Sequence, residues 1–213
     1  MFRFRWLLLS SAALFSAPSA WAGDPVLPTG GQYAAGAGTI SQSGAAMTVT
    51  QTSNRGVIDW KGFSIGQGGA VHVDNGGGAT LNRVTGGQAS SIAGTLTATG
   101  SLYLVNPQGV VVAPSGVVKA GGDVVASTHD ISNQTFMSGG PALLKSDSPG
   151  TISNLGRVSS AGGDVVLIAR EVSNAGTIQA PKGTAVLAGG TEVLLTEKRS
   201  EEHTSELQSP YVI

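Results

Sequence analysis

Cysteine is absent from the 213-residue sequence, and charged residues make up only 12% of it. Without cysteine, no disulfide framework can hold the fold, so stability must come from packing or from the stacking of repeats. The 12 Lys and Arg residues nearly balance the 13 Asp and Glu residues, and no basic cluster is present. A nucleic acid or an anionic membrane surface is therefore a poor partner for this chain.

Groupings of side chains that support catalysis or metal binding are also lacking. His72 and His129 lie far apart, and His203 falls in an atypical C-terminal segment. No His-x-x-x-His pair and no Gly-x-Ser-x-Gly elbow occurs, and the aspartates are dispersed. The sequence thus predicts that the chain is not an enzyme and that it uses no metal and no cofactor.

The N-terminal end has the features of an export signal. Arg3 and Arg5 are followed by an apolar stretch over residues 6–15, and Ala20-Trp21-Ala22 supplies a small-x-small cleavage pattern. We predict that residues 1–22 are a signal peptide that engages the Sec machinery, so the mature chain begins at Gly23.

The C-terminal end departs from the composition of the rest. Glycine disappears after Gly190, and residues 199–213 resemble the translation of a widely used sequencing adapter. We interpret this segment as an assembly artefact. Residues 23–198 then form one domain, truncated at its C-terminal end.

Short strands separated by glycines fill this domain. Runs of three to six residues rich in Val, Ile, Thr and Leu alternate with turn formers among the 32 glycines. No Gly-x-x period and no long helical period accompanies them, which excludes collagen and predicts an all-β fold.

Internal repeats select the kind of all-β fold. The segment at 120–125 recurs at 161–166, which is 41 residues later, and Ser153-Asn154 is echoed 20 residues later by Ser173-Asn174. Stacked coils of a parallel β-helix produce such echoes. If a coil takes about 20 residues, Asp123 and Asp164 are two coils apart, or about 10 Å along the axis, in structural turns.

Two stretches break the pattern. Residues 130–149 are predicted to form a loop or an extra hairpin outside the coil stack. Residues 52–65, in which Trp60 and Phe63 lie close together, are predicted to cap the N-terminal end, because the first coil of a solenoid has no preceding partner.

Asn106-Pro107-Gln108-Gly109 lies between two aliphatic runs. Asn at the first position, Pro at the second and Gly at the fourth favour a type I turn. The residues alone therefore predict a rigid turn between two buried strands.

Several segments, in order along the chain, resemble two-partner-secretion domains, which are the N-terminal domains of proteins similar to filamentous haemagglutinin. The resemblance extends over most of residues 28–197. The segments that carry it are Leu27–Gly31, Gly56–Gly66 with Trp60 and Phe63, Leu81–Val84 with Asn82 and Arg83, Ser91–Leu96, and Leu104–Val110.

The resemblance implies a right-handed parallel β-helix that acts in export. A protein of this kind crosses the periplasm of a Gram-negative bacterium and is secreted or displayed at the cell surface. POTRA modules of an outer-membrane β-barrel transporter recognise it, and it nucleates folding of a long downstream chain. The recognition motif of the family, Asn-Pro-Asn-Gly, maps onto Asn106, Pro107, Gln108 and Gly109, with Gln in place of the second Asn.

Two other functions remain as alternatives. A polysaccharide-active β-helix would need acidic and basic residues gathered on one face, and the charges here are dispersed. A carbohydrate-binding adhesin would need exposed aromatic side chains, which are scarce. Binding to a host-cell receptor would fall to a downstream region.

Overall fold

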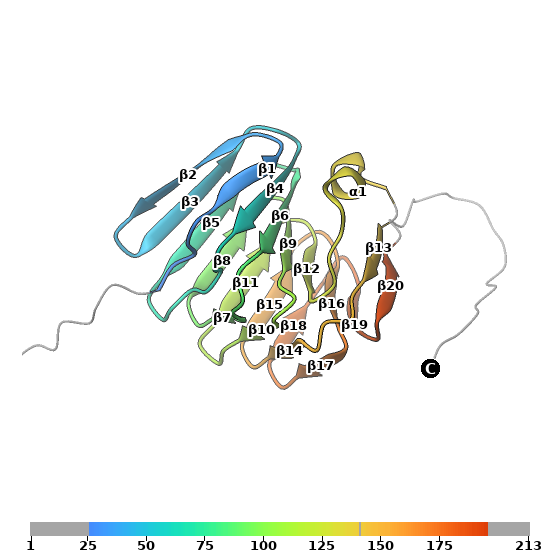
Figure 1. Cartoon of the computed structure of the whole chain (residues 1–213). Coiled ribbons are helices and arrows are strands. Elements are labelled where there is room, and N and C mark those ends of the chain that lie inside the picture. The colour runs from blue at the N-terminus through green and yellow to red at the C-terminus, as the bar shows by residue number, and fades with distance from the viewer. Residues whose placement is uncertain (1–25, 141, 196–213) are drawn as a thin grey trace, which may run out of the picture.

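The computed structural model describes residues 26–140 and 142–195, and the chain winds into a stack of β coils (Figure 1). The predicted signal peptide and the predicted adapter segment lie outside the described residues. Three sheets of mainly parallel strands run along the stack, and a complete coil contributes one strand to each of them. The predicted parallel β-helix is confirmed.

Sheet 1 has the order β1-β4-β6-β9-β12-β16-β19. Its strands are β1 (Gln32–Ala35), β4 (Arg55–Trp60), β6 (Ala79–Val84), β9 (Ser101–Val105), β12 (Val124–Ser127), β16 (Val165–Ala169) and β19 (Ala185–Gly189).

Sheet 2 has the order β18-β15-β11-β8-β5-β3-β2. Its strands are β2 (Gly38–Ser43), β3 (Ala46–Gln51), β5 (Ala70–Asp74), β8 (Thr95–Ala98), β11 (Val117–Ala120), β15 (Arg157–Ser160) and β18 (Thr177–Gln179).

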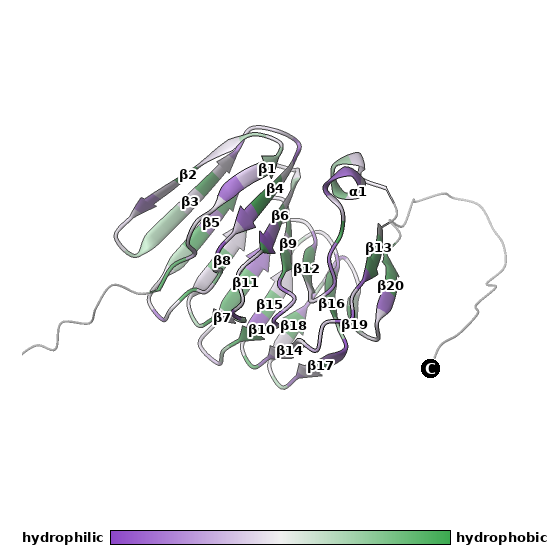
Figure 2. Ribbon diagram, in the orientation of Figure 1, coloured by the Kyte–Doolittle hydropathy of each residue, from purple (hydrophilic) through white to green (hydrophobic). Residues whose placement is uncertain are grey.

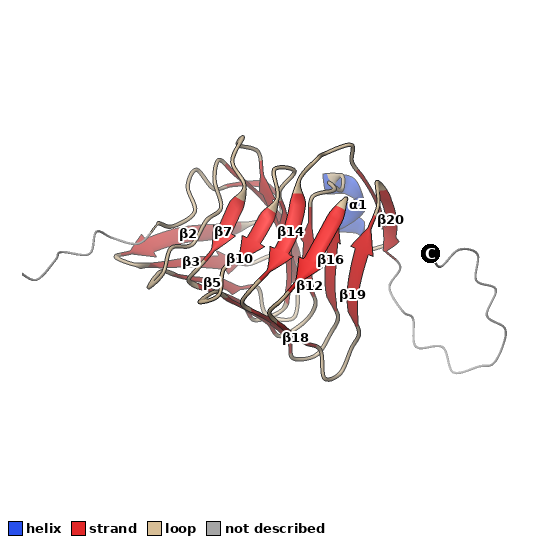
Figure 3. Cartoon of the chain, turned by 90° about the horizontal axis from the view of Figure 1, so that it is seen from below, coloured by secondary structure: helices blue, strands red, loops and turns tan. Residues whose placement is uncertain are grey.

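Sheet 3 is shorter, with the order β17-β14-β10-β7. Its strands are β7 (Ser90–Ile92), β10 (Val110–Val112), β14 (Thr151–Asn154) and β17 (Glu171–Asn174). Figure 3 shows the strands stacked along the axis.

The register of the strands confirms the 20-residue echo. Ser153 pairs with Ser173, and Val166 pairs with Val186. In each strand, alternate side chains point into the coil stack, where aliphatic residues such as Leu96, Leu102 and Ile152 are fully buried. Figure 2 shows hydrophobic and hydrophilic segments interspersed along the strands.

The predicted distance of two coils between Asp123 and Asp164 is wrong. β12 pairs directly with β16, with Val124 opposite Val165, so the two aspartates lie on neighbouring coils. The 41-residue interval holds one ordinary coil and the excursion that was predicted at 130–149.

This excursion lies outside the coil stack, as predicted, but it is not a self-contained hairpin. It contains α1 (Asn133–Ser138) and β13 (Ala142–Lys145), and β13 pairs antiparallel with β20 (Glu192–Leu195). Ser132 caps α1 by accepting the N–H of Thr135, and Gly139 ends it in the left-handed conformation with φ 68°. Figures 1 and 3 show α1 and the β13–β20 ribbon on one side of the stack.

We call α1 together with β13 and β20 the extra-helical layer. A second hydrophobic core lies between sheet 1 and this layer. Phe136 and Leu144, each 2% exposed, pack against outward-facing residues of sheet 1 such as Leu81 and Val105. The extra-helical layer is thus held by apolar burial as well as by polar contacts.

The cap of the stack begins earlier in the chain than was predicted. β1 and β2 run antiparallel to β4 and β3 and cover the N-terminal edge of the first coil. Trp60 and Phe63 lie within the first turns of the stack and belong to its core. The aromatic pair therefore fills the end of the stack, while β1 and β2 close its edge.

Candidate functional site

The segment Asn106–Gly109 forms the predicted turn. The N–H of Gly109 donates to the carbonyl of Asn106 at 3.0 Å, and the N–H of Gln108 donates to Oδ1 of Asn106 at 2.9 Å. Gly109 has φ 112°, a conformation that favours glycine. The turn is therefore fixed both by its backbone and by the Asn side chain.

Asn106 also ties the turn to the preceding coil. Its side chain is fully buried, and Nδ2 donates to the carbonyl of Gln88 and to Oγ of Ser90, both at 2.9 Å. Pro107 is half-buried and Gln108 is exposed. Gln108 is thus the residue of the motif that a partner could reach most easily.

The next coil covers the other side of the turn. Oγ of Ser148 donates to the carbonyl of Pro107, and a Cβ at Gly150 would lie 2.3 Å from the same oxygen. Sequence reasoning missed Ser148 and Gly150, because they lie at the end of the excursion and carry no local signal of this contact.

Trp60, Phe63 and Asn82 form one buried cluster. The rings of Trp60 and Phe63 meet edge to face with centroids 5.3 Å apart. Nε1 of Trp60 donates to Oδ1 of Asn82 at 3.1 Å, and Nδ2 of Asn82 donates to the carbonyl of Tyr103 at 3.2 Å. This cluster joins three successive coils and offers no surface to a partner.

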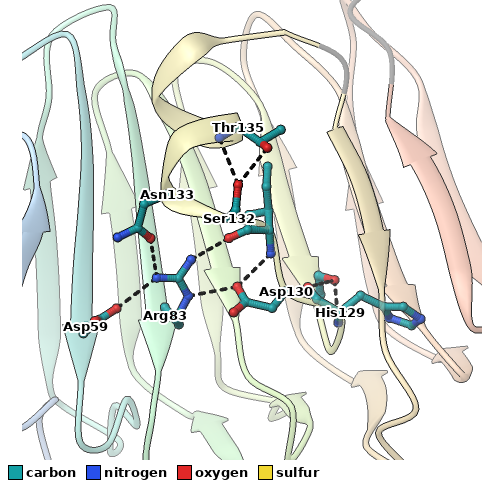
Figure 4. A network of polar contacts seen from close by, with 9 residues as sticks. Asp59, Arg83, His129, Asp130, Ser132, Asn133 and Thr135 are labelled. Atoms are coloured by element: carbon teal, nitrogen blue, oxygen red, sulfur yellow. Dashed lines mark hydrogen bonds and ion pairs between the residues drawn. The ribbon is translucent and has the colours of Figure 1, made fainter.

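Arg83 lies on the opposite face of β6 and holds the excursion. It pairs with Asp59 at 3.2 Å and with Asp130 at 2.9 Å. It also donates to Oδ1 of Asn133 at 2.7 Å and to the carbonyl of Ile131 at 2.5 Å (Figure 4). The side chain is 13% exposed, so these charge-assisted bonds are partly shielded from water.

The predicted site residues therefore separate into three structural roles. The turn at 106–109 presents Gln108, the Trp60 cluster stabilises the interior, and Arg83 anchors the extra-helical layer. Within the described ranges, no group of three or more His, Asp or Glu side chains is placed to hold a metal ion. Within the same ranges, no helix has the length and hydropathy needed to cross a bilayer.

The described residues therefore form a capped parallel β-solenoid with an extra layer on one face. The chain belongs to the TPS (two-partner secretion) secretion domain family, whose model matches residues 24–210. Proteins with this domain are exported by two-partner secretion in Gram-negative bacteria.

Two solved structures resemble the fold. The HMW1 secretion domain from Haemophilus influenzae is 28% identical, with a TM-score of 0.73, over 78% of this chain and 46% of that one. The filamentous hemagglutinin secretion domain is 20% identical, with a TM-score of 0.56, over 87% of this chain and 71% of that one, and supports the fold alone.

Curated relatives match a shorter part of the chain. Two heme/hemopexin-binding proteins of Haemophilus influenzae are each 42% identical, over 88 and 97 residues. These matches span 40% and 44% of this chain but only 10% of each relative.

Proposed function

We propose that residues 23–198 form the N-terminal export-targeting and folding-nucleation domain of a larger surface protein. Residues 1–22 direct the chain to the Sec machinery. POTRA modules of a dedicated outer-membrane β-barrel transporter then recognise the domain in the periplasm. The domain is not itself an enzyme, and any adhesin, haemolysin or receptor-binding activity belongs to downstream sequence.

The observation that carries this proposal is the difference between the two ends of the described stack. At the N-terminal end, β1 and β2 cover the edge strands, and the core residues Met47 and Val49 are 5% and 0% exposed. At the other end, core-facing Leu187 is 46% exposed, whereas Leu167, at the same register position one coil earlier, is 2% exposed.

This difference gives the stack a direction of growth. At the first coil, β1 and β2 already occupy the edges of β4 and β3 in antiparallel pairing, whereas among the described residues β17, β18 and β19 offer parallel edges to a further coil. Each added coil makes mostly local contacts. Folding can therefore proceed coil by coil from the capped N-terminal end, the seed, without first forming contacts between residues far apart in the sequence. Folding outside the cell would then favour outward movement of the chain.

The turn at 106–109 supplies the proposed contact with the transporter. Gln108 is exposed beside half-buried Pro107, and the buried bonds of Asn106 fix both in place. Gln108→Ala should therefore weaken binding to the isolated POTRA modules without unfolding the domain. Equal binding by the variant would reject this contact.

Export with a damaged cap tests the whole proposal. A Cβ at Gly31 would lie 2.4 Å from the Trp60 ring, so Gly31→Val should disrupt the seed. Nothing lies within 4 Å of a Cβ at Gly77, so Gly77→Ala is the matched control. Both would be expressed in the full-length gene beside its transporter, and secreted and periplasmic protein would be measured.

We expect Gly77→Ala to be exported normally and Gly31→Val to remain in the periplasm. Protease sensitivity would establish whether the seed of the Gly31→Val variant is unfolded. Normal export of a chain with an unfolded seed would overturn the proposal.

A further inference from the structure

The outer face of sheet 1 carries an apolar column that a solvated β-helix face does not need. The residues in register across the six parallel strands are Val57, Leu81, Tyr103, Val125, Val166 and Val186. The outer face of sheet 2 differs, because its corresponding column is entirely polar: Ser41, Thr48, His72, Thr97, Lys119, Ser159 and Gln179. The outer face of sheet 1 is therefore an apolar surface against which another segment can pack.

The extra-helical layer covers this column only in part. A groove of about 590 Å³ remains between the layer and the sheet, a volume within the usual range for ligand sites. Tyr103, Val125 and Val166 line its floor. Since these residues lie on successive coils, the groove runs along the axis of the stack.

The two walls of the groove differ in chemistry. On one side the extra-helical layer contributes Phe136, Leu144 and Leu195. On the other side, the turns that lead into β12, β16 and β19 contribute Asp123, Asp164, Lys182, Thr184 and several glycines. Arg55 also lines the groove, where it donates to the carbonyl of Phe136 at 3.1 Å and lies over its ring. An occupant therefore meets an apolar wall and a wall that carries two carboxylates.

The two carboxylates that line the groove are fixed but not neutralised. Oδ1 of Asp123 accepts the N–H of Asp164 at 2.8 Å, and Oδ1 of Asp164 accepts the N–H of Thr184 at 2.7 Å. Neither carboxylate forms an ion pair among the described residues, and Lys182 on the groove rim reaches neither. Two like charges thus lie one coil apart, about 4.8 Å along the axis.

We propose that this groove binds an extended peptide segment of another protein, with side chains that alternate between apolar and basic. Successive side chains of an extended chain point to opposite sides. Apolar side chains then face Phe136 and Leu144, while basic side chains face Asp123 and Asp164. The proposal does not depend on the export role, because it concerns the folded domain alone.

Two amide protons report on this groove directly. The N–H groups of Asp164 and Thr184 are bound to the two carboxylates, so a cation at either carboxylate shifts their NMR signals. The ¹⁵N-labelled full chain would be titrated with capped Leu-Lys-Leu-Lys-Leu. The matched probes are Leu-Glu-Leu-Glu-Leu, which reverses the charge, and Ser-Lys-Ser-Lys-Ser, which removes the apolar side chains.

We expect saturable shifts at Asp164 and Thr184 with the first peptide and much weaker binding of the other two. Asp123→Asn combined with Asp164→Asn keeps the Oδ1 acceptors but removes both charges. It should weaken binding about tenfold. Asp74→Asn, at the exposed C-terminal end of β5 in sheet 2, removes a carboxylate outside the groove and should leave affinity unchanged.

Three outcomes would overturn the proposal. They are no shift at the two amides, equal binding of the acidic peptide, and undiminished affinity of the double Asn variant. The two peptide outcomes need no variant, so the proposal stays testable even if the double variant fails to fold.

Discussion

The carboxylate of Asp123 accepts the backbone N–H of Asp164 at 2.8 Å, which joins two residues 41 positions apart in the sequence on neighbouring coils. The same kind of hydrogen bond recurs in the corresponding turns of the neighbouring coils. Oγ of Ser101 accepts the N–H of Asp123 at 3.0 Å, and Oδ1 of Asp164 accepts the N–H of Thr184 at 2.7 Å. A short side chain on each coil thus satisfies a turn N–H on the next.

Asp123→Ala should lower the free energy of unfolding by about 1–2 kcal/mol, because the N–H of Asp164 loses its partner in a half-buried turn. Asp123→Asn keeps an oxygen in the same place and should cost less than about 0.5 kcal/mol. Urea unfolding of both variants measures the difference. If Asn is as damaging as Ala, the charge of Asp123 rather than its hydrogen bond stabilises the turn.

Asn106→Asp should destabilise the domain by about 2–4 kcal/mol, because a carboxylate would face the carbonyl of Gln88 in a fully buried position. Gln108→Asn, which restores the residue usual in the family motif, alters only an exposed side chain and should change stability by less than about 0.5 kcal/mol. Thermal unfolding of the two variants tests this. A small effect of Asn106→Asp would show that the turn does not depend on the Asn donors.

Arg83→Met should release the excursion while leaving the coils intact, since Arg83 joins β6 to Asp130, Asn133 and Ile131. Amide hydrogen exchange over residues 131–138 should become at least about tenfold faster, with no change in β8 and β11. Arg157→Met is the matched control, because Arg157 is exposed on sheet 2. Unchanged exchange over residues 131–138 would mean that the second core alone holds the layer.

The coils could be predicted because each one repeats the same chemistry at the same spacing. The echo of Ser153-Asn154 at Ser173-Asn174 became a register pair in the structure. The same reasoning failed for Asp123 and Asp164, because an interval of two coil lengths looks the same as one coil plus an excursion of equal length. Periodicity measures distance along the chain and does not show where the chain leaves the stack.

Repeat spacing also limits which contacts of the site residues could be predicted. The contact between Trp60 and Asn82 spans 22 residues, about one coil, so the spacing of the repeats could have indicated it. The partners of Arg83 in the excursion lie 47 to 50 residues away, in a segment without repeats. Nothing in the sequence pattern brings these residues together, because their placement depends on how α1 packs against sheet 1.

Tyr33 gives the stability a dependence on alkaline pH. Its hydroxyl is buried with no hydrogen-bond partner among the residues that the structure describes, and desolvation raises the pKa of this phenol above its ordinary value of 10.0. The folded chain therefore keeps the proton at pH values where the unfolded chain loses it. This contribution to stability is fully present below about pH 10 and is lost as the pH rises through the raised pKa.

Tyr33→Phe should therefore be neutral or stabilising by up to about 1 kcal/mol near pH 7, since it removes an unsatisfied hydroxyl. It should also reduce the loss of stability between about pH 9 and pH 11. Urea unfolding of both proteins across this range isolates Tyr33 from the other tyrosines. Parallel stability curves for the two proteins would show that the phenol is solvated in the folded state.

The pairing of β13 with β20 makes the extra-helical layer depend on residues that follow the sixth coil. Lys145 forms an ion pair with Glu192 at 3.0 Å, and Nε2 of buried His129 contacts the carbonyl of Gly190 at 2.9 Å. Val193→Pro should break this pairing, because it removes the backbone donor that faces Leu144. The bond from the N–H of Ser146 to the carbonyl of Thr191 places the N–H of Val193 on the β13 side of β20.

We expect Val193→Pro to speed amide exchange in both α1 and β13 by at least about tenfold, since Leu144 loses the strand that covers it. Val193→Ala also shortens the side chain but keeps the backbone donor, so it should retain protection in both elements. Exchange confined to β13, with α1 still protected, would mean that Arg83 and Phe136 hold the helix independently. The layer would then consist of two separate units, because closure of the ribbon would no longer be needed to stabilise α1.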